Sequence, residues 1–190
     1  MNLLIANKTV ADALKSWLGV ITVFLAGAYS LFEYIEHKQS VRVERSLGYV
    51  EHYRDSNTAE AKLSLNQLLV NNQKTLIALL NNNYADEAEL NSAFNKLILS
   101  ITETPAVHRN LEIAFTFFEE AAICVEHDLC DQEVIKSFFL NDAKSLFNSF
   151  YPYVCQLRKQ WKNDTVYLKL ENFYVNPEKD ICQSFTGTEQ

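Results

Sequence analysis

The sequence predicts an all-α protein in which an N-terminal transmembrane helix continues into a cytoplasmic helical bundle. Glycine and proline are scarce, with 4 and 3 among 190 residues, which favours helices over sheets. Residues 16–32 form an uncharged and largely apolar run. Beyond this run, apolar residues recur every three or four positions, as in amphipathic helices. We expect an N-terminal segment and span over 1–37, one bundle over 38–175 and a flexible polar tail over 176–190.

The apolar run from Ser16 to Phe32 is predicted to cross a membrane. Its seventeen residues rise about 25 Å as a helix, which is near the minimum for crossing a bilayer. Trp17 and Tyr34 lie where aromatic rings favour the headgroup layer. The alternative is a buried helix of a soluble protein.

Cations are more frequent after the span than before it. Lys38, Arg42 and Arg45 follow it, whereas Lys8 and Lys15 precede it. This bias predicts a single-pass protein of the inner (cytoplasmic) membrane with most of the chain in the cytoplasm. The three cations after the span also predict a basic cluster that faces anionic lipid.

The helix that contains the span is expected to continue to about Arg54, with Val43, Leu47 and Val50 forming an apolar stripe on the opposite side from Arg45 and His52. Four further helices are expected before the last one, over 59–81, from 86, over 106–126 and over 131–140. The helix over 106–126 is the most apolar, so it should lie at the centre of the bundle.

Local signals mark where several of these helices begin and bend. Asp86 and Asp131 are expected to cap helices, and Pro105 suits a first helical position. Asp142 is expected to open the last long helix, which should bend at Pro152. A segment near the end, TVYLKLENFYV, should pack back on the bundle.

The charge and the cysteines limit the class of partner. A net charge of -7 argues against nucleic acid, because phosphate contacts need a surplus of Lys and Arg. The four cysteines are too few and too irregular for a disulfide scaffold, which favours a reducing compartment.

The expected partners are the lipid bilayer, copies of the same chain and an unknown protein. Small residues along the span, which allow helices to approach closely, support self-association. No cofactor is expected.

Glu119 and Arg158 each flank the apolar stripe of a predicted helix. A half-buried charge is costly unless it is matched, so we expect these two residues to form a structural ion pair between the helices.

Cys124, His127 and Cys130 follow the pattern C-x2-H-x2-C near a predicted helix end. Three such ligands could hold zinc with a fourth from another helix. The alternative is that Cys124 belongs to the core and that the spacing arises by chance.

The spacing of Arg45 and His52 is similar to the Arg-x4-6-His element of HEPN ribonucleases, which would imply metal-independent RNA cleavage on a helical bundle. The alternative is that Arg45 belongs only to the basic cluster after the span. The sequence contains no Ser/His/Asp set, phosphate-binding glycine loop or HExxH motif that would indicate another reaction.

From Arg45 to Tyr174 the chain resembles uncharacterised bacterial membrane-anchored helical proteins that are grouped as a domain of unknown function. The matching pieces are RSLGYVEHYRDS, FTFFEEAAICVEHDLCDQEVIKSFF, YPYVCQLRKQW and YLKLENFY. The resemblance points to Phe117, Phe118, Glu119, Asp131, Phe138 and Arg158. His127 and Asp128 stand where the pattern has a turn glycine.

This resemblance implies the architecture and the membrane location but no activity. In layout the chain also resembles the membrane accessory proteins of RNA-targeting CRISPR systems, which combine one span with a HEPN-like bundle and assemble into pores. We therefore expect a membrane-anchored helical interaction protein that self-associates. The alternative function is a HEPN-like RNA-acting or pore-forming antiviral defence effector.

Overall fold

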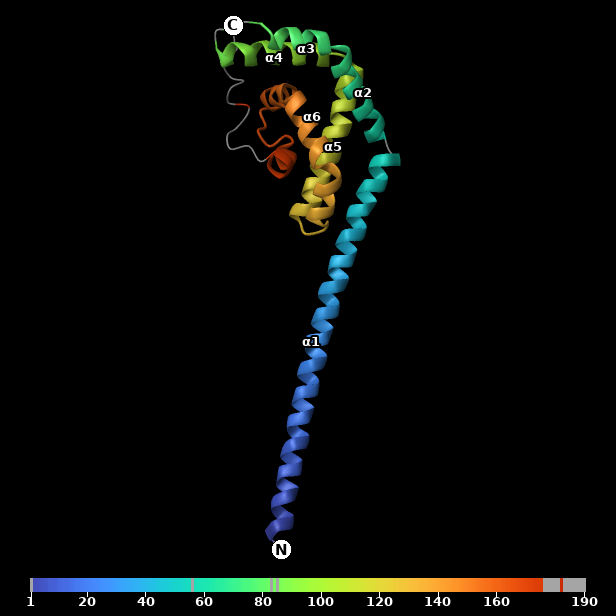
Figure 1. Ribbon diagram of the computed structural model, residues 1–190, viewed down its shortest axis with the longest axis vertical. Helices are drawn as coiled ribbons and strands as arrows, with labels where there is room; N and C mark the ends of the chain where they lie inside the picture. Colours follow the sequence, from blue (N-terminus) through green and yellow to red (C-terminus); the bar gives the residue numbers. More distant parts are fainter. Residues whose placement is uncertain (1, 56, 83, 85, 176–181, 183–190) are drawn as a thin grey trace. The chain divides into compact units, whose positions relative to one another are not determined.

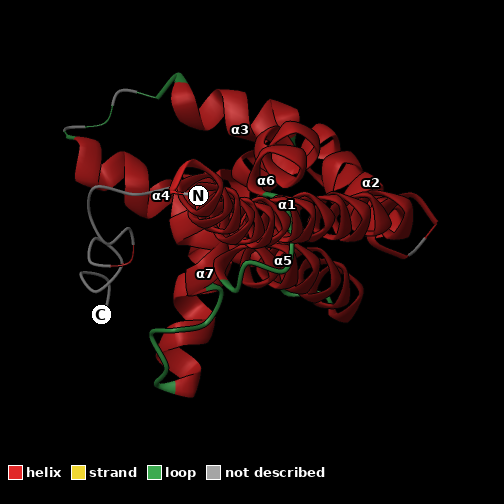
Figure 2. Ribbon diagram, turned by 90° about the horizontal axis from the view of Figure 1, so that it is seen from below, coloured by secondary structure: helices red, strands yellow, loops and turns green. Residues whose placement is uncertain are grey.

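The computed structural model describes residues 2–55, 57–82, 84, 86–175 and 182, and all regular secondary structure in them is helical (Figure 2). The chain forms two compact units, residues 1–42 and residues 43–190. The predicted all-α fold is therefore confirmed. The predicted polar tail lies outside the described residues except for Cys182.

The first helix, α1, is a single helix over Asn2–Asp55 (Figure 1). Side chains from Trp17 to Ser40 are exposed. Within the described residues, one helix is long and apolar enough to cross a membrane, and it is this one. The prediction that the helix continues past the apolar run to about Arg54 is confirmed.

The second predicted helix is divided into α2, Asn57–Asn71, and α3, Gln73–Leu80. The division falls at Asn72, where φ is -97° and ψ is 6°. The Asn72 side-chain amide donates to the Leu68 carbonyl at 2.9 Å, a local hydrogen bond of the kind that competes with regular helix.

Helix α4, Glu87–Thr102, begins as its sequence predicts. The Asp86 carboxylate accepts a hydrogen bond from the Glu89 backbone N–H at 2.8 Å, which satisfies one of the free donors of the first turn. The predicted cap is therefore confirmed. Helix α3 packs against α4, and α4 packs against α6.

Helix α5, Pro105–Glu126, lies at the centre of the second unit, as predicted. It contacts α2, α6 and α7, and it runs beside α6 in Figure 1. Pro105 occupies the start of the helix, where its missing N–H costs no hydrogen bond. Eight side chains of α5 are buried: Leu111, Ala114, Phe115, Phe117, Phe118, Ala121, Ala122 and Cys124.

Helix α6 is continuous over Gln132–Trp161. Asp131 caps it by accepting from the Val134 N–H at 3.0 Å, as predicted. The prediction that Asp142 opens a new helix is wrong. Its carboxylate accepts a hydrogen bond from the Tyr53 hydroxyl at 3.1 Å and forms an ion pair with Lys62, so it serves tertiary contacts inside the helix.

The predicted bend of α6 is confirmed near Pro152. Phe150 has φ -122° and ψ 17°, which is outside the helical range. Pro152 lacks the N–H that would bond four residues back, so the helix is free to kink there.

The last described elements are α7, Leu168–Leu170, and a π-helical turn, Glu171–Val175. Leu170 is buried, and Tyr167 and Phe173 are partly buried against the core. The prediction that this segment packs back on the bundle is confirmed.

Candidate functional site

A pocket of about 360 Å³ lies between α1 and the end of α5, and both residues of the Arg45-x6-His52 element line it. The rest of its lining comes from Gly48, Tyr49, Glu120, Cys124 and Leu129. All of these residues belong to the second compact unit. The structure therefore brings the two predicted residues together with a carboxylate that the sequence had not indicated.

The α1 wall of this pocket is held by a polar contact and by aromatic packing. The buried Ser46 hydroxyl accepts a hydrogen bond from the Asp131 N–H at 2.7 Å. The Tyr49 ring meets the Phe117 ring edge-on at 5.9 Å, and the His52 ring stacks on Phe117 at 6.3 Å between centroids.

The buried side of α1 in this region contains Ser46 and Val50. Leu47, predicted to belong to the apolar stripe, is exposed. Arg45 and His52 thus flank the buried side instead of lying opposite to it. The stripe prediction is confirmed for Val50 and wrong for Leu47. Ser46 takes an inward position with its hydrogen bond to Asp131, and the partly buried Tyr49 and Tyr53 widen the packed side.

The pocket combines a cation, an imidazole and a carboxylate with apolar surface. Burial and the nearby Glu120 carboxylate raise the pKa of the Tyr49 hydroxyl, so Tyr49 remains a neutral hydrogen-bonding group at physiological pH. Arg45 can bind an anionic group, and the His52 imidazole can donate or accept a hydrogen bond. Gly48 leaves open space, since a Cβ placed there would meet nothing within 4 Å.

The predicted zinc ligands do not form a metal site. Cys124 and Cys130 form a disulfide, so neither sulfur is the thiolate that zinc requires. Among the described residues, no group of three or more His, Cys, Asp or Glu side chains is arranged to hold a metal ion. His127 is the C-cap of α5, so the three residues mark a turn.

The same turn explains the position where the related pattern has glycine. Asp128 has φ 59°, the left-handed conformation that glycine adopts without strain and that aspartate tolerates better than most residues. The N–H groups of Leu129 and Cys130 both reach the Cys124 carbonyl, at 3.0 and 3.1 Å. The turn therefore keeps its geometry without glycine.

The cysteines, which were expected to be too few and too irregular for a disulfide scaffold, form two disulfides. Cys155 and Cys182 form a second bond across 27 residues, so all four cysteines, which lie among the described residues, are bonded. Spacing along the chain did not reveal either pair, because the turn after α5 brings Cys130 to Cys124, and Cys155 and Cys182 come from segments that are far apart in the sequence.

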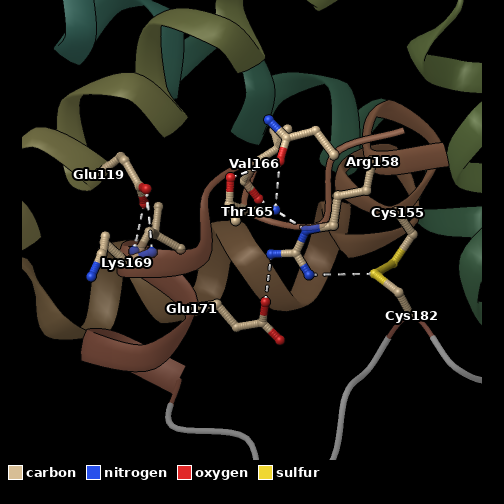
Figure 3. Close-up of polar contacts among 10 residues, drawn as sticks. Glu119, Cys155, Arg158, Thr165, Val166, Lys169, Glu171 and Cys182 are labelled. Atoms are coloured by element: carbon tan, nitrogen blue, oxygen red, sulfur yellow. Dashed lines mark hydrogen bonds and ion pairs between the residues drawn. A yellow bond between two sulfur atoms is a disulfide. The ribbon is translucent and has the colours of Figure 1, made fainter. Parts of the chain in front are cut away.

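Arg158 is buried beside the second disulfide and has a different partner from the predicted one (Figure 3). Its Nη2 lies 2.6 Å from Glu171 Oε2, and its Nε donates to the Val166 carbonyl at 2.9 Å. Its Nη1 lies 3.7 Å from Cys182 Sγ. The predicted ion pair between Glu119 and Arg158 is therefore wrong, although Arg158 is paired as a buried charge requires.

Glu119 instead holds the start of the last helical segment (Figure 3). Its two carboxylate oxygens accept hydrogen bonds from the N–H groups of Lys169 and Leu170, at 3.2 and 2.6 Å. Burial raises the pKa of Glu119, and the two backbone hydrogen bonds and the nearby Lys169 and Arg158 charges oppose this increase. Both predicted residues thus act structurally, in one polar cluster that joins α5, α6 and the segment after α6.

The predicted lipid-facing cations all lie on α1. Lys38 and Arg45 are exposed and Arg42 is partly exposed. Contact with lipid stays a prediction for these residues.

No sequence pattern indicated two of these functional residues, Glu171 and Glu120. Glu171 follows no recognisable motif, and Glu120 is one of two adjacent glutamates on α5, of which the resemblance singled out the other. Each was found only through the element that packs against it.

Together, these features define a helical protein with one candidate membrane span and a domain whose interior charges serve its own architecture. The chain belongs to the DUF4760 family, a domain of unknown function whose family model matches residues 20–176. The predicted likeness to an uncharacterised domain family is confirmed at this level. Neither a search of curated proteins nor a search of solved structures gave a match.

Proposed function

We propose that this protein is a membrane-anchored helical interaction protein, which binds protein partners and further copies of itself. The observation that carries the proposal is the exposed apolar part of α1. Val23 and Phe24 are 75% and 80% exposed, and the apolar side chains around them are exposed as well. A run of this length in water would cost far more than isolated surface residues do, and a bilayer removes that cost.

The one polar side chain in the middle of this run is compatible with lipid. The Thr22 hydroxyl donates to the Leu18 carbonyl at 2.8 Å within the helix, so its hydrogen bond is satisfied without water. Lys38, Arg42 and Arg45 follow the run, and we propose that they contact anionic headgroups.

Membrane fractionation tests the anchor. The protein should stay in the membrane pellet after alkaline carbonate extraction, and replacement of Val23 and Phe24 by lysine should release it. Trp161→Lys is the matched control, because Trp161 is also a large exposed side chain but lies at the end of α6. A wild-type protein that is fully extracted by carbonate would refute the anchor.

A binding role is supported by the way the buried charges are used. Arg158 and Glu171 bond to each other, and Glu119 bonds to backbone N–H groups. A general acid or base must reach a substrate proton, whereas these groups are committed to holding the last segment on the bundle.

Two observations bear on which side of the membrane holds the helical domain. The excess of cations after the span predicts that the helical domain lies in the cytoplasm. Disulfides, in contrast, persist in oxidising compartments. We propose the oxidising side, because both cysteine pairs are bonded and the cation bias is small.

Thiol trapping under denaturing, non-reducing conditions tests this orientation. The protein taken from membranes should react with maleimide only after reduction. Four reactive thiols before reduction would instead support the cytoplasmic orientation.

A second function is favoured by one observation, which is that Arg45 and His52 line the same pocket as Glu120. Such a site suits the HEPN-like RNA-acting or pore-forming defence effector. Replacing Arg45 and His52 by alanine should abolish RNA cleavage or toxicity, while Arg54→Ala, an exposed arginine of α1 outside the pocket lining, should not. Unchanged toxicity in the double variant would exclude this function.

A further inference from the structure

Helices α2 and α3 carry large apolar side chains on their exposed side. Leu63 and Val70 are 66% and 63% exposed on α2, and Ile77 and Leu80 are 47% and 67% exposed on α3. The two helices are divided at Asn72, and exposed apolar side chains lie on both sides of this division.

These side chains point away from the interior of their own domain. The buried residues of α2 include Ala61 and Leu65, and that of α3 is Leu79. At 100° per residue, Leu63 lies about 160° from both Ala61 and Leu65, and Ile77 lies about 160° from Leu79. The core of the domain therefore does not require them to be apolar.

The same surface is almost free of charge. From Leu63 to Asn82 the chain has one charged residue, Lys74, although the whole protein has 41 charged residues and a net charge of -7. Depletion of charge together with apolar residues is the composition of an interface core. Two acidic copies that approach through this surface avoid the repulsion that most other surfaces would produce.

We infer that the exposed side of α2 and α3, centred on Val70, is a surface through which two copies of this chain associate. This inference rests on the self-association in the proposed function and names its site. A surface with little charge offers few groups with which to select an oppositely charged partner, whereas it is compatible with itself. Anchoring in one membrane would also raise the effective concentration of copies.

Val70 lies close to the division between the two helices, with Leu63 before it on α2 and Ile77 after it on α3. Because the chain is divided at Asn72, the surface is a patch across two helices and not one heptad stripe. A two-fold contact centred on Val70 would bring the two Val70 side chains together, which is the same-surface contact typical of homodimers.

This symmetry allows a test with opposite charges at a single position. In detergent, the full-length Val70→Glu and Val70→Lys variants should each lose association, with a dissociation constant raised by more than about a hundredfold, since like charges then face each other. A co-expressed mixture of the two variants should recover the wild-type oligomer, because Glu then faces Lys. Sedimentation velocity measures the species present.

Trp161→Glu provides the control, because it adds the same charge at an exposed apolar position of α6 and should leave association unchanged. Wild-type behaviour of both Val70 variants would overturn the inference. So would a mixture that stays monomeric, which would assign the surface to lipid or to another protein. Carbonate extraction of the same variants reports the anchor separately, so a failed anchor and a failed interface give different results.

Discussion

The buried pair of Arg158 and Glu171 gives the sharpest prediction about what holds the fold together. The two side chains are only 7% and 3% exposed, and Nη2 and Oε2 are 2.6 Å apart. Replacing Glu171 by leucine leaves the guanidinium buried without its carboxylate. Breaking a buried ion pair from one side typically costs about 3–5 kcal/mol. We expect the lower end of this range, because Arg158 would keep its hydrogen bond to the Val166 carbonyl.

In a chain of this size each kcal/mol shifts the melting temperature by about 2–4 °C. Glu171→Leu should therefore lower Tm by about 6–12 °C, and Arg158→Met should lower it by a similar amount. The double variant, in which neither charge remains, should lose less than the sum of the two single variants. Trp161 lies three residues after Arg158, so its fluorescence during thermal unfolding in detergent reports on this region.

Glu133→Leu is the matched control, because Glu133 is exposed at the start of the same helix and its removal should change Tm little. Single variants that melt with the wild type would refute the structural role of the pair. Strictly additive losses would show that the two charges do not act together.

Three further predictions follow from the same structure. Because burial raises the pKa of Glu119, its stabilising contribution is complete below the ordinary glutamate pKa and is lost as pH rises through the raised value. The stability of the wild type relative to Glu119→Gln should therefore fall as the pH rises above the ordinary glutamate pKa. A difference in urea unfolding that does not change with pH would contradict this. Gly48→Ala should stabilise the domain by about 0.5–1 kcal/mol, because Gly48 lies inside α1 and an added Cβ meets nothing within 4 Å. Destabilisation in urea unfolding would show that the open space beside Gly48 is needed for folding. Loss of the bond between Cys155 and Cys182, which are separated by 27 residues, should lower the free energy of unfolding by about 3–4 kcal/mol. Loss of the bond between Cys124 and Cys130, which are separated by 6 residues, should lower it by about 2 kcal/mol, because the closed loop is shorter. If serine replacement of Cys124 and Cys130 costs more stability than replacement of Cys155 and Cys182, the loop-closure reasoning is refuted.

The features that could be predicted from the sequence are those decided within a few residues. Asp86 and Asp131 cap helices because a short carboxylate three residues before a free N–H bonds to it in almost any surroundings. Pro105 and Pro152 act through their own missing N–H groups. The apolar stripe of α5 indicated a central position, because a central helix can bury apolar side chains against several neighbouring elements.

The failures involve side chains whose partners come from elsewhere in the chain. Aspartate is a residue type typical of helix starts, but the Asp142 carboxylate binds the Tyr53 hydroxyl and Lys62. It does not cap a helix, and α6 continues through it. A helical wheel showed that Arg158 and Glu119 flank core faces but could not indicate what packs against them. For both residues the helical wheel placed the side chain correctly at the edge of the core, but the partner belonged to another element.

The sequence by itself determined that this is a helical protein with one apolar segment able to span a membrane, because hydrophobic periodicity and length follow from composition along the chain. Tertiary structure decided which charges meet, which cysteines bond and which residues line the pocket with Arg45 and His52. Those outcomes depend on distances between segments up to about ninety residues apart, such as Ser46 and Asp131, whose contact spans 85 positions. No periodicity within either segment specifies such a distance, and only the packed helices set it.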